Sequence, residues 1–136
     1  MSKLGVDWAG CRTGIKMFNS GGFFDAHEVL EDAWRALPRT SATKKHLQGL
    51  VQLSVAFHHQ SRGNHVGARS VLERALRNLN GADSSFPDLD LDRLRAELAP
   101  WRRYLDESAG AEMKRLVGRD LHLDTAPPLP KILLRR

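Results

Sequence analysis

Hydrophobic residues recur along this chain at intervals of three and four positions, and the alternating β-branched pattern typical of strands is scarce. Such spacing gives each segment one apolar stripe, and it predicts an all-α protein with a bundle of five to six helices. Glycine, asparagine and proline residues between the apolar runs mark the expected helix ends. The expected helices span residues 6–18, 23–37, 44–62 and 65–79, a fifth begins after Asp90 and is kinked or split by Pro100, and residues 111–117 form a short sixth.

The C-terminal part of the chain departs from this helical pattern. Three of the four residues at 127–130 are proline, which predicts an extended, Pro-rich tail. Leu129 and the apolar run 132–134 are unsuited to a free tail, so we expect it to lie against the bundle or against another subunit. The second alternative leaves open a homodimer through the C-terminal tail. The expected organisation is a single domain over residues 1–136, with a helical core at about 6–108 and a tail at 109–136.

A shift of 42 residues aligns the second expected helix with the fourth. The matching positions are Ala26, Val29, Leu30, Glu31, Ala33 and Arg35, which meet identical residues at 68, 71, 72, 73, 75 and 77. Each of these helices follows a Gly/Asn turn and another helix, so the pattern predicts two quasi-repeated helical hairpins. His27 and Glu28 meet Arg69 and Ser70 in the second copy, so packing alone does not require a His-Glu pair.

The composition is that of an ordinary globular protein, with 41% hydrophobic and 27% charged residues. Cys11 is the only cysteine, which excludes an internal disulfide and favours a cytoplasmic location. No signal peptide or long apolar run is present, so we expect no membrane association. The net charge is +5, but the arginines are scattered between acidic residues, so nucleic acid is not an expected partner.

The most distinctive polar residues are expected on two helices that follow one another. They are His27, Glu28, Glu31 and Trp34 on the second helix and Gln48, Gln52, His58 and His59 on the third. His27 and Glu31 are four residues apart, so their side chains project from the same side of a helix. If the two helices pack antiparallel through a short loop, the start of the second faces the end of the third. We therefore expect His27 close to His58 and His59.

Three segments resemble the bacterial and archaeal domain-of-unknown-function family 309. They are Phe18-Asn19-Ser20-Gly21 running into Phe24-Asp25-Ala26-His27-Glu28-Val29-Leu30-Glu31 and Trp34; Leu47-Gln48-Gly49-Leu50-Val51-Gln52-Leu53 with Ala56 and His58; and Arg62-Gly63-Asn64 with Gly67-Ala68. The resemblance covers about residues 12–80 and fades after Leu98. Asp25 stands where the family more often has Glu. The resemblance implies a small helical bundle and no established activity.

Three interpretations of these polar residues stay open. In the first, Glu, His and Gln side chains satisfy one another in a structural network between the helices. In the second, a small ligand or a peptide binds at His27, Glu28, Glu31, Trp34, Gln48, Gln52 and His58. In the third, a divalent metal is held by His27, Glu31 and His58 or His59, in a metal-binding protein or a metal-dependent hydrolase.

The chain supplies His-Glu-x-x-Glu where zinc peptidases carry His-Glu-x-x-His, and no nucleophile constellation is evident. We therefore predict a non-catalytic scaffold or binding module for an unknown small molecule or protein, with the metal site as its alternative.

Overall fold

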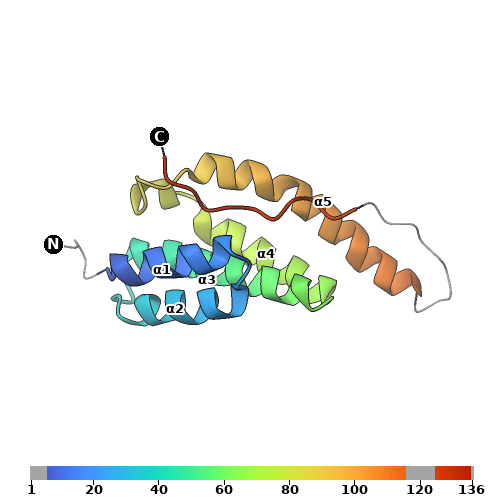
Figure 1. Cartoon of the computed structure of the whole chain (residues 1–136), viewed down its shortest axis with the longest axis horizontal. Helices are drawn as coiled ribbons and strands as arrows, with labels where there is room; N and C mark the ends of the chain where they lie inside the picture. The colour runs from blue at the N-terminus through green and yellow to red at the C-terminus, as the bar shows by residue number, and fades with distance from the viewer. Residues whose placement is uncertain (1–5, 116–124, 136) are drawn as a thin grey trace.

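Five α-helices make up most of the chain in the computed structural model, which describes residues 6–115 and 125–135. The helices are α1 (Trp8–Asn19), α2 (Phe23–Arg35), α3 (Ala42–Ser61), α4 (His65–Leu79) and α5 (Leu91–Arg115), with a short 3₁₀ turn, η2 (Ala82–Ser84), before α5 (Figure 1). The predicted all-α bundle is confirmed. Within the described ranges, no helix is both long and apolar enough to cross a membrane.

The last helix differs from the sequence prediction. Pro100 lies inside α5 and neither splits nor ends it. The helix also continues through Gly110 to Arg115, so residues 111–115 belong to α5 and the prediction of a separate short helix there is wrong. Residues 116 and 117 lie outside the described part of the chain. Pro100 is exposed, so the backbone carbonyl that loses its helical partner can hydrogen-bond with water.

The two predicted hairpins have matching turns, 42 residues apart in the sequence. Gly21 and Gly63 adopt positive φ angles of 85° and 76°, a backbone conformation that glycine reaches without strain. The Gly21 amide donates to the Phe18 carbonyl and the Gly63 amide to the Gln60 carbonyl, each at 3.0 Å. The next helix begins two residues after each glycine, at Phe23 and at His65. The predicted repeat is therefore confirmed in the backbone of its turns.

Each hairpin contains a glycine at a close contact between its two helices. A Cβ added to Gly14 on α1 would lie 2.6 Å from Leu30 Cγ on α2, and one added to Gly49 on α3 would lie 2.8 Å from Leu79 Cγ on α4. In both hairpins a glycine thus allows two antiparallel helices to approach closely. The two glycines are not equivalent positions of the repeat, because the 42-residue shift takes Gly14 to Ala56 and Leu30 to Leu72.

Aromatic side chains join α1, α3 and α5 at the centre of the core. The ring centroids of Phe57 and Trp101 are 5.0 Å apart with an interplanar angle of 89°, and those of Phe18 and Phe57 are 6.1 Å apart at 90°. Trp101 is only 2% exposed. Edge-to-face pairs of this kind add to the stability that apolar burial provides. They hold α5 against the first four helices.

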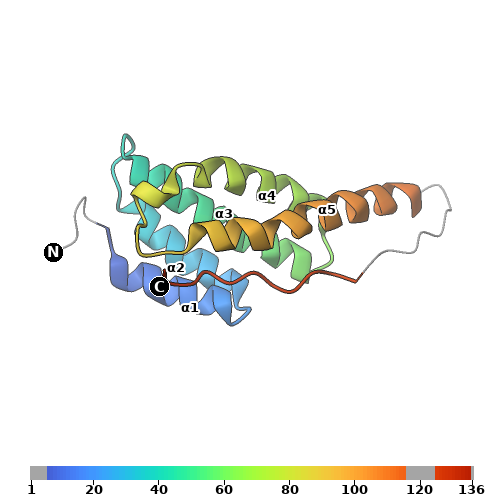
Figure 2. The same ribbon diagram turned by 90° about the horizontal axis from the view of Figure 1, so that it is seen from above.

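The C-terminal segment runs between α1 and α5, antiparallel to both (Figures 1 and 2). Asn19 at the end of α1 anchors it, because the Asn19 side chain donates to the Ile132 carbonyl at 2.9 Å and accepts from the Ile132 amide at 2.8 Å. Trp101 Nε1 donates to the Pro128 carbonyl at 2.8 Å from the α5 side. Leu134 pairs with Leu89 in an isolated antiparallel bridge.

Of the two expected positions for the tail, the structure shows the first. Ile132 is buried in the core of its own chain, at 2% exposure. The homodimer through this tail stays a prediction.

Candidate functional site

The His-Glu pair that the sequence singled out lies along one side of α2. His27 Nε2 is 2.8 Å from Glu31 Oε2, and Arg35 Nη2 is 3.0 Å from Glu31 Oε1. The corresponding residue in the second hairpin, Glu73, instead binds Arg102 on α5 through two contacts of 2.8 and 3.1 Å. Glu31 therefore links side chains of its own helix, whereas its repeat partner links two helices.

The start of α2 faces the end of α3, as predicted. The Phe24 ring packs against the His27 ring at 6.0 Å and against the His58 ring at 5.4 Å, measured between centroids. These three side chains and Val55 border a shallow hollow of about 150 Å³. Its volume suits one apolar side chain better than a drug-sized ligand, for which pockets of about 300–1,000 Å³ are usual.

The remaining predicted residues do not join this hollow. Gln52 accepts a 2.7 Å hydrogen bond from Asn78 on α4, and Glu28 is exposed. Gln48 borders a different hollow, together with Trp34. The single His/Glu/Gln cluster expected between helices two and three is therefore not assembled. Gln48 and Gln52 lie one turn apart on α3, but Gln48 is near Trp34 of α2 whereas Gln52 contacts α4. The spacing in the sequence does not show which neighbouring helix each side chain meets.

The predicted metal ligands are not brought together either. Among the residues that the structure describes, no group of three or more His, Cys, Asp or Glu side chains is placed to hold a metal ion. The Phe24 ring packs against both His27 and His58. His59 instead lies in the last turn of α3, where its Nδ1 atom is 3.4 Å from Asn64 Nδ2 in the turn that follows. The set of His27, Glu31, His58 and His59 thus gains no support from this geometry.

A larger hollow lies elsewhere among the described residues, between α1 and the C-terminal segment. It has a volume of about 630 Å³ and adjoins a second hollow of about 360 Å³, and we call the two together the α1–tail groove. They share Arg12, Ile15, Leu89 and Leu134. The larger part is also lined by Lys16, Asn19, Asp90, Arg93, Ile132, Leu133 and Arg135, and the smaller by Trp8, Cys11, Leu50, Phe86, Pro87 and Asp88.

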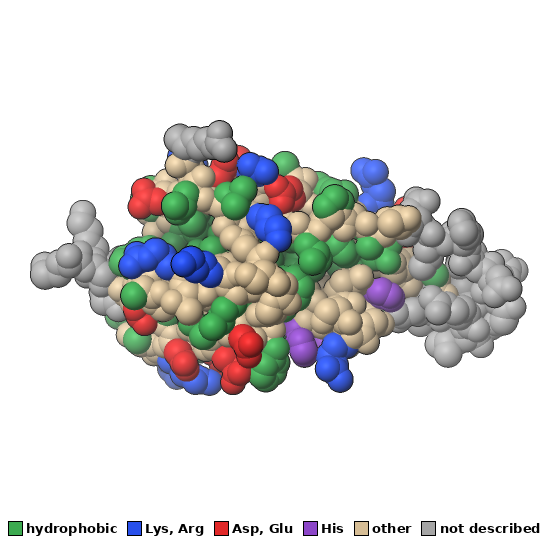
Figure 3. All heavy atoms as spheres, viewed as in Figure 1, with side chains coloured by type: hydrophobic (Ala, Val, Ile, Leu, Met, Phe, Trp, Pro, Cys, Tyr) green, Lys and Arg blue, Asp and Glu red, His purple; other side chains and the backbone are tan. Residues whose placement is uncertain are grey.

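Cations predominate along the larger part of the α1–tail groove. Arg12 and Lys16 of α1 are exposed, and blue side chains lie beside hydrophobic ones over α1 in Figure 3. Arg93 is 3.1 Å from Glu97, and Arg135 is 3.8 Å from Asp83, so these two have acidic neighbours. Helical periodicity could not predict this groove, because Asn19 on one wall and Leu89 on the other are 70 positions apart in the sequence.

Cys11 borders the apolar part of the groove, but it is not suited to nucleophilic chemistry. The residue is 2% exposed, and burial, together with the nearby Asp7 carboxylate, raises the pKa of the Cys11 thiol to about 11. The thiol is therefore protonated near neutral pH, and a protonated thiol is a poor nucleophile.

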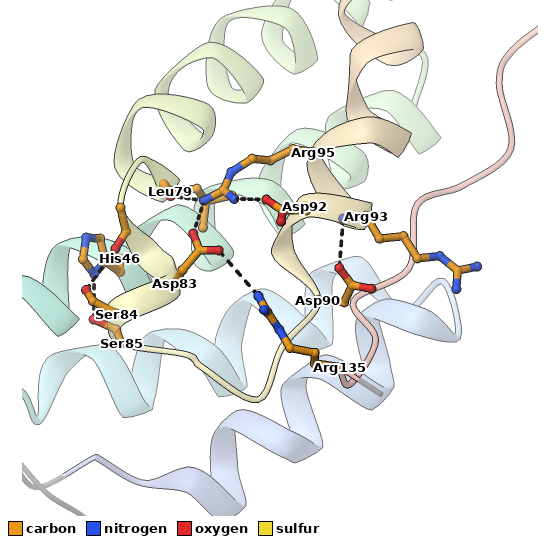
Figure 4. Close-up of polar contacts among 11 residues, drawn as sticks. His46, Leu79, Asp83, Ser84, Ser85, Asp90, Asp92, Arg93, Arg95 and Arg135 are labelled. Atoms are coloured by element: carbon orange, nitrogen blue, oxygen red, sulfur yellow. Dashed lines mark hydrogen bonds and ion pairs between the residues drawn. The ribbon is translucent and has the colours of Figure 1, made fainter.

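A buried polar network lies where α4 ends and α5 begins (Figure 4). The His46 Nδ1 atom is 2.6 Å from the Ser85 hydroxyl, which is 3.2 Å from the Thr43 hydroxyl. Burial of the ring, followed by the positive charge of Lys45, lowers the pKa of His46 below its ordinary value. None of the hollows described above is lined by His46 or Ser85, so we interpret this network as a structural connection.

An ion pair beside this network holds the same corner of the molecule. Arg95 of α5 donates to Asp83 at 2.7 Å and to the Leu79 carbonyl at 2.9 Å, and Figure 4 shows Arg135 approaching Asp83 from the C-terminal segment. The hydrogen bond from Arg95 lowers the pKa of Asp83. The end of α4, the turn η2, the start of α5 and the C-terminal segment therefore converge on one carboxylate.

Acidification should destabilise the fold through His46. Because the pKa of His46 is lowered in the folded chain, the unfolded chain binds a proton at a pH where the folded chain does not. The stabilising contribution of neutral His46 is present above the ordinary pKa of 6.5 and is lost as the pH falls from there toward the lowered folded-state value. Urea unfolding at several pH values below about 8 measures it.

The matched control for this pH dependence is His46→Gln, whose amide can keep the contact with Ser85 without titrating. We expect its free energy of unfolding to depend less steeply on pH than that of the wild type below pH 6.5. Equal slopes for the two proteins would show that the wild-type ring takes up a proton in the folded chain as readily as in the unfolded one.

Comparison with known proteins bears directly on the first four helices. Residues 11–71 match a family described as "Domain of unknown function (DUF309)". Over these 61 residues, the chain is similar to that family. The resemblance inferred from the sequence is confirmed.

Two relatives are uncharacterised proteins. An uncharacterised protein of Aquifex aeolicus (strain VF5) is 30% identical over 95 residues, which are 70% of this chain and 26% of that protein. The uncharacterised protein YpuF of Bacillus subtilis (strain 168) is 34% identical over 73 residues, which are 54% of this chain and 41% of YpuF. The chain thus aligns with less than half the length of either relative.

The DUF309 match includes all the site residues predicted from the sequence, and it ends within α4. It also includes the α1 side of the groove, with Arg12, Ile15 and Lys16. The opposite wall, from Leu89 to Arg135, lies beyond the matched residues. The groove therefore combines a helix that lies mostly within the match with parts of the chain outside it.

Proposed function

We propose that this chain is a non-catalytic binding module that holds an acidic, partly apolar peptide segment of another protein in the α1–tail groove. The observation that carries the proposal is the combination of an apolar floor and a largely cationic rim in this hollow of about 630 Å³. Helical hairpin proteins commonly use such concave surfaces for partners. The earlier expectation of a ligand at His27 and its neighbours is replaced by this location.

The shape of the groove favours an elongated occupant. Residues Trp8 to Asn19 line it along α1, which corresponds to a length of about 16 Å at 1.5 Å per residue. An extended peptide rises about 3.3 Å per residue, so roughly five residues would span this length. The C-terminal segment of the chain itself already lies extended beside α1, which shows that the surface accommodates such a backbone.

The charges along the groove favour acidic side chains in that occupant. Four cations, Arg12, Lys16, Arg93 and Arg135, line the larger part, against one acid, Asp90. Opposite charges at an interface speed association and select between partners, even where they contribute modestly to affinity. Leucine, isoleucine or phenylalanine side chains of the peptide would contact Ile15, Leu89 and Leu134 on the floor.

The proposal is tested by selecting peptides of about twelve residues from a random display library against the full chain, a length that exceeds the groove at about 3.3 Å per residue. We expect enrichment of Asp or Glu together with Leu, Ile or Phe. The dissociation constant of the strongest peptide should then increase at least about tenfold when Arg12→Glu and Lys16→Glu are combined, because two attractive contacts become repulsive.

The matched control combines Arg77→Glu and Arg103→Glu, two exposed arginines on α4 and α5 whose reversal changes the net charge equally. Binding should be nearly unchanged in this variant. If both double variants weakened peptide binding equally, the effect would come from overall charge, and the groove would be rejected as the binding site. Phe24→Ala provides a further check, since loss of binding in that variant would place the peptide at the hollow beside His27 and His58.

A further inference from the structure

A separate hollow of about 260 Å³ opens where α2 leads into α3. It is lined by Trp34 near the end of α2, by Arg39 in the loop, and by Lys44, Lys45 and Gln48 in the first two turns of α3. We call it the Trp34 hollow. It lies apart from the α1–tail groove and shares none of its lining residues.

All the ionisable side chains that line the Trp34 hollow are cations. Three cations border this one hollow, and an anion bound in it would be attracted by all three.

Two polar groups, on Lys44 and Trp34, belong to residues that line the hollow. Lys44 Nζ donates to the Leu37 carbonyl at 3.0 Å and lies 4.3 Å from the centroid of the Trp34 ring. The Trp34 Nε1 atom is buried and has no hydrogen-bond partner among the described residues. A buried N–H without an acceptor is costly, and the ring that carries it is one of the residues that line the hollow.

We propose that the Trp34 hollow binds the phosphate group of a small phosphomonoester. A phosphomonoester carries about −1.5 to −2 charges and three strong acceptor oxygens near neutral pH, which suits three cations and the amide of Gln48. Arg39 can bind two phosphate oxygens at once, and Lys44 and Lys45 act as point charges. The first turn of α3 adds the positive end of its helix dipole.

The size of the hollow argues against a nucleic-acid strand as the source of the phosphate. A backbone of phosphodiesters is bound by cations spread along several successive phosphates. Here the cations converge on one hollow of about 260 Å³, which leaves room for the phosphate and a small organic group. The proposed ligand class is therefore a small phosphorylated metabolite.

The test uses ¹H–¹⁵N correlation spectra of the full chain, in which the indole signals of Trp8, Trp34 and Trp101 report separately. The Trp34 signal is identified by its loss in Trp34→Phe. Titration with inorganic phosphate should move the Trp34 signal in a saturable way and leave the other two nearly unchanged. Titration with sodium chloride to the same ionic strength should move none of them. Acetate should act more weakly than phosphate, because it carries a single charge.

The variants locate the site. Arg39→Ala combined with Lys45→Ala should increase the dissociation constant for phosphate at least about tenfold, while the control pair Arg77→Ala and Arg103→Ala should leave it within about twofold. Each pair of substitutions removes two exposed cations, so we expect the two variants to have similar stability.

Three results would overturn the proposal. They are an unmoved Trp34 signal, a shift reproduced by chloride, and equal weakening by both pairs. Addition of glucose 6-phosphate and of a short single-stranded DNA separates the sources. Tighter binding of the sugar phosphate than of inorganic phosphate supports a metabolite, and tighter binding of the DNA rejects it.

Discussion

Trp101→Ala should lower the free energy of unfolding by about 3–5 kcal/mol, the range for removing a large aromatic side chain from a packed core. Trp101 is 2% exposed and packs edge-to-face against Phe57 on α3 at 5.0 Å and against Tyr104 at 5.4 Å. Its Nε1 also donates to the Pro128 carbonyl. One residue therefore joins α5, α3 and the C-terminal segment, and its loss is large against a typical total of about 5–15 kcal/mol.

Denaturant unfolding followed by far-ultraviolet circular dichroism measures this loss, and Trp101→Phe separates its causes. Phenylalanine keeps an aromatic ring against Phe57 but cannot donate to the Pro128 carbonyl. We expect Trp101→Phe to lose less than half as much stability as the alanine variant. A loss below about 1 kcal/mol for Trp101→Ala would mean that α5 contributes little to the cooperative fold.

The second large effect is expected at the contact between α3 and α4, where Gly49→Val should destabilise the protein by about 1–3 kcal/mol through overpacking. A Cβ at this position would lie 2.8 Å from Leu79 Cγ and 3.2 Å from the Ala75 carbonyl oxygen. The branched carbon of leucine and a helix backbone cannot move aside easily. The two helices would have to separate along this contact.

Gly110→Val is the matched control, because Gly110 also lies inside a helix but a Cβ added there meets nothing within 4 Å. Valine has a somewhat better helix propensity than glycine, so this variant should change stability by less than about 0.5 kcal/mol. Thermal or denaturant unfolding of both variants gives the comparison. If both variants lost similar stability, the cause would be the presence of valine in a helix and not the close contact between α3 and α4.

The candidate site was predictable only where it depended on neighbours within one helix or across one short turn. His27 and Glu31 pair as their four-residue spacing indicated, and the short loop after α2 brings Phe24 and His27 to His58. Gln52 was misplaced, because the row it occupies on α3 faces Asn78 of α4. Helical periodicity defines the angle between side chains on one helix, but not which neighbouring helix covers each face.

By itself, the sequence determined the local structure of this protein and its duplication. Three- and four-residue spacing placed the helices, Gly21 and Gly63 ended two of them, and the 42-residue shift related the hairpins. Only the tertiary structure decided that the C-terminal segment lies between α1 and α5, and that Arg12 and Leu134 border the same groove. The physical reason is that periodicity records short-range geometry, whereas contacts between distant segments depend on how all the apolar faces are buried together.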